Sequence, residues 1–384
     1  MSPIILNSAS LLALSCLAAI PALAQDVSPL TDIITVSGHQ PDTGRVDRLD
    51  PATLPPSGPD AAALIARLPG AATLGNGALS GQVQYRGLSG GRINLRIDGQ
   101  SFASGGPNLM DPPLHYAPIA LIERIEVDRS VSPVRNGPGL AGGVNTVFKQ
   151  VGFGETGQWQ TRHDLTLAGR TADDSTAYGG VVGIANDQIR VQLLGSRESG
   201  GDISWPGGTI GGSQHERLVY GAGLGFRTGV HEVSLDLRRQ ETGATGNPPF
   251  AMDIRYFDTD FARLGYRGDW DGVSVNAHLA MADVAHAMNN FDLRPAPAMA
   301  AMYRESLATA QTVSGGADAA FDALGGSLRL GFDGEQAEHD LAITNPDNAD
   351  FVLNSLSGIT MERSGAFAEW TGALGGWETE LGLR

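Results

Sequence analysis

Residues 121–149 read LIERIEVDRSVSPVRNGPGLAGGVNTVFK, and this stretch decides the fold. It opens with apolar residues set among charges, passes through a glycine and proline cluster at 137–143, and ends in a short strand pattern from Val144 to Phe148. Glycine supplies the positive-φ positions that other residues resist in tight turns. The stretch therefore predicts compact mixed structure.

After Lys149 the sequence changes to one strand pattern after another, separated by Gly, Asn and Asp. Val233 to Arg238 and Ser327 to Asp333 alternate apolar and polar residues, as half-buried strands do. We expect ten or eleven strands of about ten residues, joined by short turns on one side and longer polar loops on the other. This pattern is typical of an outer-membrane barrel. A soluble sandwich or propeller is the alternative, although no 40-residue repeat supports a propeller.

The composition narrows the class of partner. The chain has 384 residues and a formal charge of −16. Nucleic acid is not expected as a partner, because phosphate contacts require Lys and Arg. Beyond the N-terminal leader no apolar run approaches the length of a membrane helix, which excludes a helical membrane protein.

The first 59 residues contain no predicted domain. Residues 1–24 have the pattern of a signal peptide that ends in Ala22-Leu23-Ala24, and Cys16, the single cysteine, lies inside it. A lipid anchor at Cys16 is the alternative interpretation. Residues 25–59 are polar and rich in proline, and we expect an extended segment there. Its one β-prone run, Asp32 to Gly38, is either a strand that docks on the following domain or a peptide that adds to a partner's sheet edge.

Residues 60–150 predict a small α+β domain. A short helix is expected over 60–69, with Asp60 as its N-cap, and strands are expected over 82–86 and 92–97. Asp98-Gly99 is a hairpin turn signal. The segment from Ser101 to Pro118 is a long loop whose Pro-Pro pair stiffens the backbone behind Met110.

These parts resemble a TonB-dependent outer-membrane receptor. The motifs that carry the resemblance occur in the family's order: Leu68-Pro69-Gly70, Arg86-Gly87-Leu88, Ile97-Asp98-Gly99, Ile122-Glu123-Arg124-Ile125-Glu126-Val127 and Gly142-Gly143-Val144-Asn145. The resemblance implies a plug domain at 60–150 and, at 155–384, about half of a 22-stranded antiparallel transmembrane β-barrel. It implies residence in the outer membrane of a Gram-negative bacterium, in contact with its lipid. It also implies a TonB box at 32–38, made by Ile33, Ile34, Thr35, Val36 and Ser37, that binds TonB and its inner-membrane energising complex.

A narrower resemblance is to the copper receptors of this family. Their plug loop carries a Cys and a Met four residues apart; here Met110 matches the Met, and Gly106 stands where the Cys is expected. His286-Ala287-Met288 resembles their second metal segment. The resemblance implies that copper is the transported ligand, held by Met110, His286 and Met288; no organic cofactor is expected. The preference for Cu(I) comes from the chemistry of the thioether and imidazole ligands.

The residues make a similar case without the family. In the strand pattern that begins at Val273, the even-numbered residues His278, His286 and Met288 share the polar face if the strand has no bulge. Thioether and imidazole form a soft ligand set suited to copper. The alternative is that Met288 packs in the core and His286 is a solvated rim histidine. Weaker ligand candidates are Met252, Met299, Met302, His115 and His278.

No enzyme is predicted. Gly137-x-Gly139-x-x-Gly142 matches a dinucleotide fingerprint, but Pro138 lies inside it and no helix follows. Two further functions stay open: a TonB-dependent receptor for a siderophore or other metal chelate, and a non-transporting adhesin or signalling β protein. The chain stops at Arg384 within a strand pattern. Because an open sheet edge is not tolerated in lipid, we expect the sequence to be part of a longer protein that does not insert as 1–384 alone.

Overall fold

The structure is a computed structural model that describes residues 46–54, 58–79, 81–106, 111–129 and 131–384. The expected signal peptide, the expected TonB box at 32–38 and Met110 lie outside the described residues.

The N-terminal region contains two small sheets. The first has the strand order β1 (Val46–Leu49), β6 (Ile122–Asp128), β7 (Gly143–Phe148), β5 (Asn94–Ile97), and only its β5–β7 pair is parallel. The second consists of β2 (Ala71–Gly75), β3 (Gly81–Tyr85) and β4 (Leu88–Ser89). Strand β1 lies in the stretch 25–59, where the sequence showed no strand beyond 32–38; its pairing with β6 over four residues holds it in the sheet.

The helices of this region are short. The predicted helix over 60–69 is shorter than expected: α2 spans Ala62–Ile65, and the bonds that follow, from Arg67 N to Leu64 O and from Leu68 N to Ile65 O, are of the tighter i→i+3 type. Asp60 acts as the predicted cap, since its Oδ1 accepts from Ala62 N at 2.9 Å.

The 3₁₀ turns are η1 (Gly90–Arg92), η3 (Pro113–Tyr116), η4 (Ile119–Leu121), η5 (Val134–Asn136) and, later in the chain, η6 (Ala300–Met302). No helix among the described residues is long and apolar enough to cross a membrane.

The Asp98-Gly99 turn is confirmed. Both residues have positive φ, 50° and 76°, as a type I′ turn requires, and Ile97 and Gln100 exchange backbone hydrogen bonds across it. Asp98 also fixes the neighbouring strand, because its Oδ1 accepts from Phe148 N at 2.9 Å.

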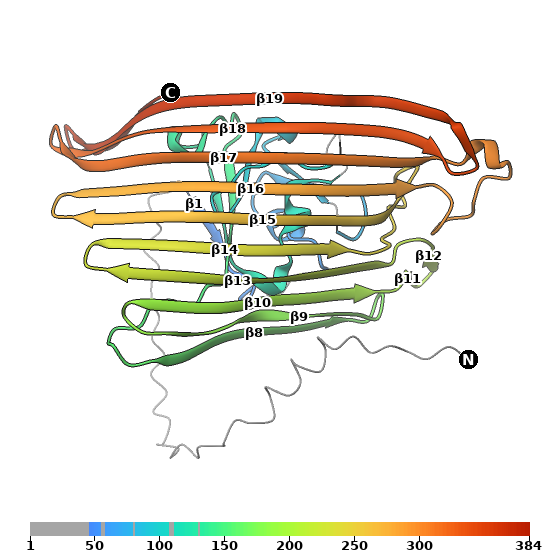
Figure 1. Ribbon diagram of the computed structural model, residues 1–384, viewed down its shortest axis with the longest axis horizontal. Coiled ribbons are helices and arrows are strands. Elements are labelled where there is room, and N and C mark those ends of the chain that lie inside the picture. The colour runs from blue at the N-terminus through green and yellow to red at the C-terminus, as the bar shows by residue number, and fades with distance from the viewer. Residues whose placement is uncertain (1–45, 55–57, 80, 107–110, 130) are drawn as a thin grey trace, which may run out of the picture. The chain divides into compact units, whose positions relative to one another are not determined.

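Eleven antiparallel strands form the second part of the structure, each paired with the strand of this sheet that precedes or follows it in the chain (Figure 1). They are β8 (Gln160–Arg170), β9 (Ser175–Ala185), β10 (Ile189–Gly200), β13 (His215–Thr228), β14 (His231–Thr242), β15 (Asp253–Trp270), β16 (Val273–Asn289), β17 (Glu305–Ala323), β18 (Gly326–Asn345), β19 (Asn348–Leu374) and β20 (Trp377–Leu383). The number of strands is as predicted. Their length is not: they range from 7 to 27 residues.

The connections of the large sheet differ at its two ends. At one end the strands are joined by turns at 186–188, 229–230, 271–272, 324–325 and 375–376. At the other end three connectors are longer, 201–214, 243–252 and 290–304, and two are short turns, 171–174 and 346–347. The first of the long connectors carries a small hairpin, β11 (Ile203–Trp205) with β12 (Gly208–Ile210). The prediction of short turns on one side is confirmed, and that of longer loops on the other side holds for three of its five connectors.

The two faces of the large sheet differ in chemistry. Exposed large apolar side chains lie at alternate positions, among them Leu165, Leu167, Val182, Ile184, Leu224, Phe226, Leu279, Met281 and Phe332. Buried polar side chains occupy the opposite face, among them Gln192, Glu198, Arg217, Gln240, Thr259 and Thr312. The inner, polar face packs on the N-terminal region, since one core cluster contains Ile65, Tyr116 and Val127 together with Phe257 and Met288.

Candidate functional site

His286 and Met288 lie near the end of β16, on its inner face. From position 280 to 288 every even-numbered residue of β16 is buried, whereas Leu279, Met281 and Asp283 are exposed. The side chains of His286 and Met288 are 4% and 3% exposed. The interpretation of His286 as a solvated rim residue is therefore wrong.

The local register keeps these two side chains on one face. Phe257 of β15 pairs with His286, and Ile254 pairs with Met288, while the extra residue of a β-bulge lies between Ile254 and Tyr256 on β15. Strand β16 itself runs without a bulge through both positions. Because the irregularity falls on the partner strand, His286 and Met288 keep the i, i+2 relation that the alternation predicts.

The N-terminal segment 101–118 approaches His286 closely at Gly105. A Cβ on Gly105 would lie 2.9 Å from Val284 Cγ1 and 3.2 Å from His286 Cβ. The backbone can therefore come this near to β16 only because Gly105 has no side chain. The same segment is held to the sheet by Ala103 N, which donates to Thr312 Oγ1 at 3.1 Å.

A cluster of three rings joins the segment to the sheet. The Phe257 ring contacts two imidazoles in tilted arrangements, with its centroid 4.6 Å from that of His115 and 4.5 Å from that of His286. His115 and Phe257 are fully buried. His115 was only a weak candidate in the sequence, because nothing in a loop without periodicity shows that it reaches the sheet.

The donor atoms of the two β16 side chains are suited to a soft metal ion. His286 Nε2 is buried and has no hydrogen-bond partner among the described residues. A buried ring nitrogen without a partner is costly unless something binds it. The Met288 thioether lies two residues away on the same face, in the core cluster with Ile254. A neutral imidazole and a thioether can hold Cu(I) and are poor ligands for Ca²⁺ or Mg²⁺.

Asp111 is a buried carboxyl in the segment that approaches His286, and nothing in the sequence indicated its burial. Its Oδ1 accepts from Gly106 N at 2.6 Å, and its Oδ2 accepts from Tyr116 Oη at 3.2 Å. Burial raises the pKa of Asp111 to about 7, against the lowering effect of these hydrogen bonds. Asp111 thus ties the backbone before the 107–110 stretch to the 3₁₀ turn after it.

His115 is held from the sheet side. Its Nε2 lies 3.1 Å from Thr242 Oγ1, and its carbonyl accepts hydrogen bonds from Arg217 and Gln240. Burial, followed by the charge of Arg217, lowers the pKa of His115 well below its usual value, so the ring is neutral at physiological pH.

The other ligand candidates lie elsewhere. His278 is on the same face of β16, eight residues before His286 and next to Gly316 of β17. Met299 and Met302 are 61% and 50% exposed in the 290–304 connector. Met252 is half-buried against the core that contains Met288. The described residues contain no group of three His, Cys, Asp or Glu that could hold a metal ion.

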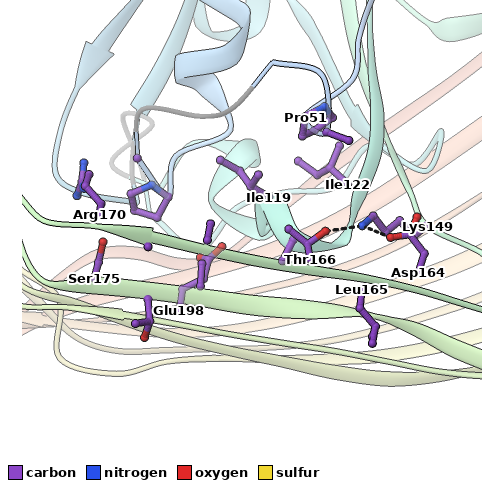
Figure 2. Close-up of a pocket in the computed structure, with 18 of the residues that line it drawn as sticks. Pro51, Ile119, Ile122, Lys149, Asp164, Leu165, Thr166, Arg170, Ser175 and Glu198 are labelled. Carbon is purple, nitrogen blue, oxygen red and sulfur yellow. Dashed lines mark hydrogen bonds and ion pairs between the residues drawn. The ribbon is translucent and has the colours of Figure 1, made fainter. Parts of the chain in front are cut away.

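A cavity of about 490 Å³ lies apart from this site, between the N-terminal region and β8–β9 (Figure 2). Pro51, Ile119 and Ile122 line one side. On the other side Lys149 Nζ donates to Asp164 Oδ1 at 2.6 Å and to Thr166 Oγ1 at 2.7 Å. The cavity contains none of the ligand candidates.

Comparisons with known proteins agree with this architecture. Residues 53–144 match the family model of the TonB-dependent receptor plug domain. No curated protein matches the sequence. The copper transporter OprC superposes with a TM-score of 0.73 at 22% identity, over 85% of this chain and 52% of that one.

Two other solved receptors give similar matches. A mutant of the ferric enterobactin receptor PfeA from Pseudomonas aeruginosa has a TM-score of 0.60 at 17% identity, over 85% of this chain and 55% of that one. A double mutant of the Serratia marcescens hemophore receptor HasR, solved with its hemophore HasA and heme, has a TM-score of 0.63 at 18% identity, over 88% and 51%. The chain thus spans about half the length of the solved structures it matches, and at these identities the likeness shows the fold: a plug domain and part of a barrel.

Proposed function

We propose that this chain, which belongs to the TonB-dependent receptors by its plug domain and its fold, serves to bind copper and import it across the outer membrane into the periplasm. The energy would come from TonB and its inner-membrane complex. No chemical transformation is proposed. The cargo would be captured by soft ligands and released when the plug moves.

One observation carries the copper assignment. Among the described residues, none is a hydrogen-bond partner of the buried His286 Nε2, which lies two residues from the Met288 thioether and against the plug segment at Gly105. An imidazole nitrogen without a hydrogen-bond partner, together with a thioether, provides two ligand atoms for a soft metal ion. Met110, expected as the third ligand, belongs to the same plug segment. The likeness to OprC, a copper transporter, supports the proposal.

The proposal includes the parts of the chain that the structure leaves undescribed. Residues 1–24 would direct secretion, and Ile33, Ile34, Thr35, Val36 and Ser37 would form the TonB box. The plug would occupy 60–150 and the membrane-spanning strands 155–384. Deletion of 33–37 is expected to abolish copper accumulation by cells while leaving copper binding by the purified receptor unchanged. Uptake that survives the deletion would instead support a non-transporting β protein.

The direct test is an anaerobic Cu(I) titration of the full-length receptor in detergent. We expect stoichiometric binding, and we expect the Met110→Ala/Met288→Ala variant to bind at least about 100-fold more weakly, because even the loss of a residue that supports a metal ligand costs about 10- to 100-fold. Met299→Ala/Met302→Ala, which removes two exposed thioethers, is the matched control and should bind normally. Weak binding by the native receptor, or equal binding by all three proteins, would refute the copper assignment.

The second candidate cargo is a siderophore or other metal chelate. The observation that favours it is the cavity of about 490 Å³ between the plug and β8–β9, which has the volume of a small-molecule site. Ferric siderophore binding that is lost on Ile119→Trp, which fills this cavity, and kept on Met288→Ala would favour the chelate over the ion.

A further inference from the structure

Arg294 joins two of the long connectors of the sheet. Its guanidinium binds the Asp253 carboxylate with both Nε and Nη2, at 2.7 and 2.6 Å, and its Nη1 donates to Phe250 O at 2.6 Å. A weaker bond runs from Nη2 to Asn247 O at 3.3 Å. Arg294 lies in connector 290–304, whereas Asn247 and Phe250 lie in connector 243–252. A bidentate guanidinium–carboxylate pair fixes direction as well as distance.

Asn247 carries this connection to the plug. Its backbone N donates to Asp253 Oδ1 at 2.8 Å, so the same carboxylate holds both Arg294 and Asn247. Its side-chain amide nitrogen donates to Asn76 O at 3.2 Å. The contact with the plug is close: a Cβ on Gly77 would lie 2.1 Å from the Asn247 amide and 2.8 Å from Gly246 O. Glycine at 77 is therefore needed for connector 243–252 to rest on the plug.

The connection lies directly beyond the candidate metal site. Asp253 pairs with Asn289, the residue after Met288, and Ile254 pairs with Met288 itself. Thr245 and Ile254 exchange backbone hydrogen bonds, which places connector 243–252 over the end of β15. Asn247, Asp253 and Met288 are all 3% exposed or less. The long-connector end of the site is thus covered by protein.

We propose that the Arg294–Asp253–Asn247 clasp closes the approach to His286 and Met288, so that the site accepts a single metal ion stripped of its chelator and excludes organic chelates. This inference rests on the proposed function in placing the cargo at His286 and Met288. A bare ion that replaces its hydration shell with protein donors needs no cavity of its own. A chelate of siderophore size needs a cavity of about 300–1,000 Å³, and the cavity of about 490 Å³ lies between the plug and β8–β9 instead.

The labelling rate of a single cysteine placed beside His286 measures whether the approach to the site is closed, and it does so in the metal-free receptor. Ala308 of β17 pairs with His286 and is 5% exposed, so Ala308→Cys places the thiol beside the site. Cys16, the single cysteine of residues 1–384, is replaced by Ser, as is any cysteine in the rest of the full-length receptor. The metal-free, full-length receptor in outer membranes is reacted with N-ethylmaleimide and with a maleimide carrying a polyethylene glycol chain. We expect slow labelling by both reagents. Fast labelling by the bulky reagent would refute the inference, whatever the receptor does with copper.

The clasp is then opened with Arg294→Met. We expect labelling of the thiol to accelerate at least about tenfold, because one partner of a largely buried charge pair has been removed. Arg304→Met is the matched control, since Arg304 lies in the same connector but donates to the carbonyls of Ala301 and Tyr303 and lies over the Phe351 ring instead of pairing with Asp253. Arg294→Lys keeps part of the pair and should label at an intermediate rate, which guards against a general folding defect. An unchanged rate in Arg294→Met, or an equal acceleration in Arg304→Met, would overturn the proposal.

The two proposals fail separately. If the receptor binds no Cu(I) but the Ala308→Cys thiol labels slowly, the clasp is supported and the copper assignment is refuted. If the receptor binds Cu(I) through Met288 but the thiol labels quickly, the copper assignment is supported and the clasp is refuted.

Discussion

Arg217 of β13 provides the main test of how the plug is held in the sheet. Its side chain is 1% exposed, as is that of Glu198, its partner on β10. Two of its nitrogens bind Glu198 Oε2, and its remaining hydrogen bonds go to plug carbonyls, those of His115 and Pro59. One buried cation therefore satisfies a carboxylate of the sheet and two backbone oxygens of the plug.

Arg217→Met should loosen the plug segment around His115. The substitution leaves Glu198 as an unpaired carboxylate whose side chain is 1% exposed, and removal of one partner of a buried pair costs about 3–5 kcal/mol. Opening of the segment would let water reach Glu198 and relieve that cost. The opening free energy should therefore fall by a similar amount, and each 1.4 kcal/mol is about tenfold, so the opened population rises about 100- to 4,000-fold.

Native-state hydrogen exchange measures this population directly. The amides of His115 and Ala117 donate within the 3₁₀ turn, to Pro112 O and Leu114 O. We expect their protection to fall by the factor above in Arg217→Met, while amides of β18 keep theirs. The Arg217→Met/Glu198→Met variant removes the stranded charge and leaves the plug carbonyls short of donors, at about 1–3 kcal/mol. Its loss of protection should be smaller than that of the single variant.

The comparison of single and double variants can refute the reasoning. If Arg217→Met lowers protection less than about fivefold, which is about 1 kcal/mol, Glu198 is not a desolvated charge. If the double variant loses as much protection as the single one, the carbonyl contacts and not the ion pair hold the plug.

Three further outcomes are expected. Burial raises the pKa of Asp60 to about 6, so the folded plug binds more protons than the unfolded chain between about pH 4 and 6. The plug should therefore gain stability as the pH falls from 7 to 5, which hydrogen exchange would show as slower exchange of the α2 amides after correction for intrinsic rates. Asp60→Asn should abolish this gain. Gly105→Ala forces a Cβ to 2.9 Å from a side-chain carbon of β16 and should cost about 1–3 kcal/mol in denaturant unfolding, whereas Gly91→Ala, with open space at the Cβ, should be neutral. Phe257→Ala empties the space between the two imidazoles and should cost about 3–5 kcal/mol by the same measurement; a cost below about 1 kcal/mol would show that the rings collapse onto each other.

The strand pattern was readable because alternation depends only on neighbouring residues. The even-numbered face of β16, with His286 and Met288, followed from that rule alone. Strand lengths did not follow, because alternation marks only the part of a strand with an apolar outer face. In β19 the ladder continues through Glu362, Arg363 and Ser364, where backbone hydrogen bonds suffice without apolar side chains.

The contacts that build the site were largely beyond the sequence. Glu198 and Arg217 become partners only through the register of β10 and β13, which no local pattern fixes. Asp111 and His115 belong to a loop, and their burial depends on strands more than a hundred residues later in the chain. Motif and periodicity thus located His286 and Met288 on β16, whereas the burial of Asp111 and His115 on the plug side of the site depends on tertiary packing.

The order of strands has a consequence for how the chain folds. In the large sheet every hydrogen-bonded neighbour is also the next strand of that sheet in the chain, so each closure spans a connector of at most 15 residues and the sheet can grow hairpin by hairpin. The plug sheet is different: Val46 pairs with Asp128, and Asn94 pairs in parallel with Gly143. These distant pairings carry a larger entropic cost before any contact forms. The plug is therefore expected to acquire its native sheet in a separate, slower kinetic phase than the hairpins of the barrel.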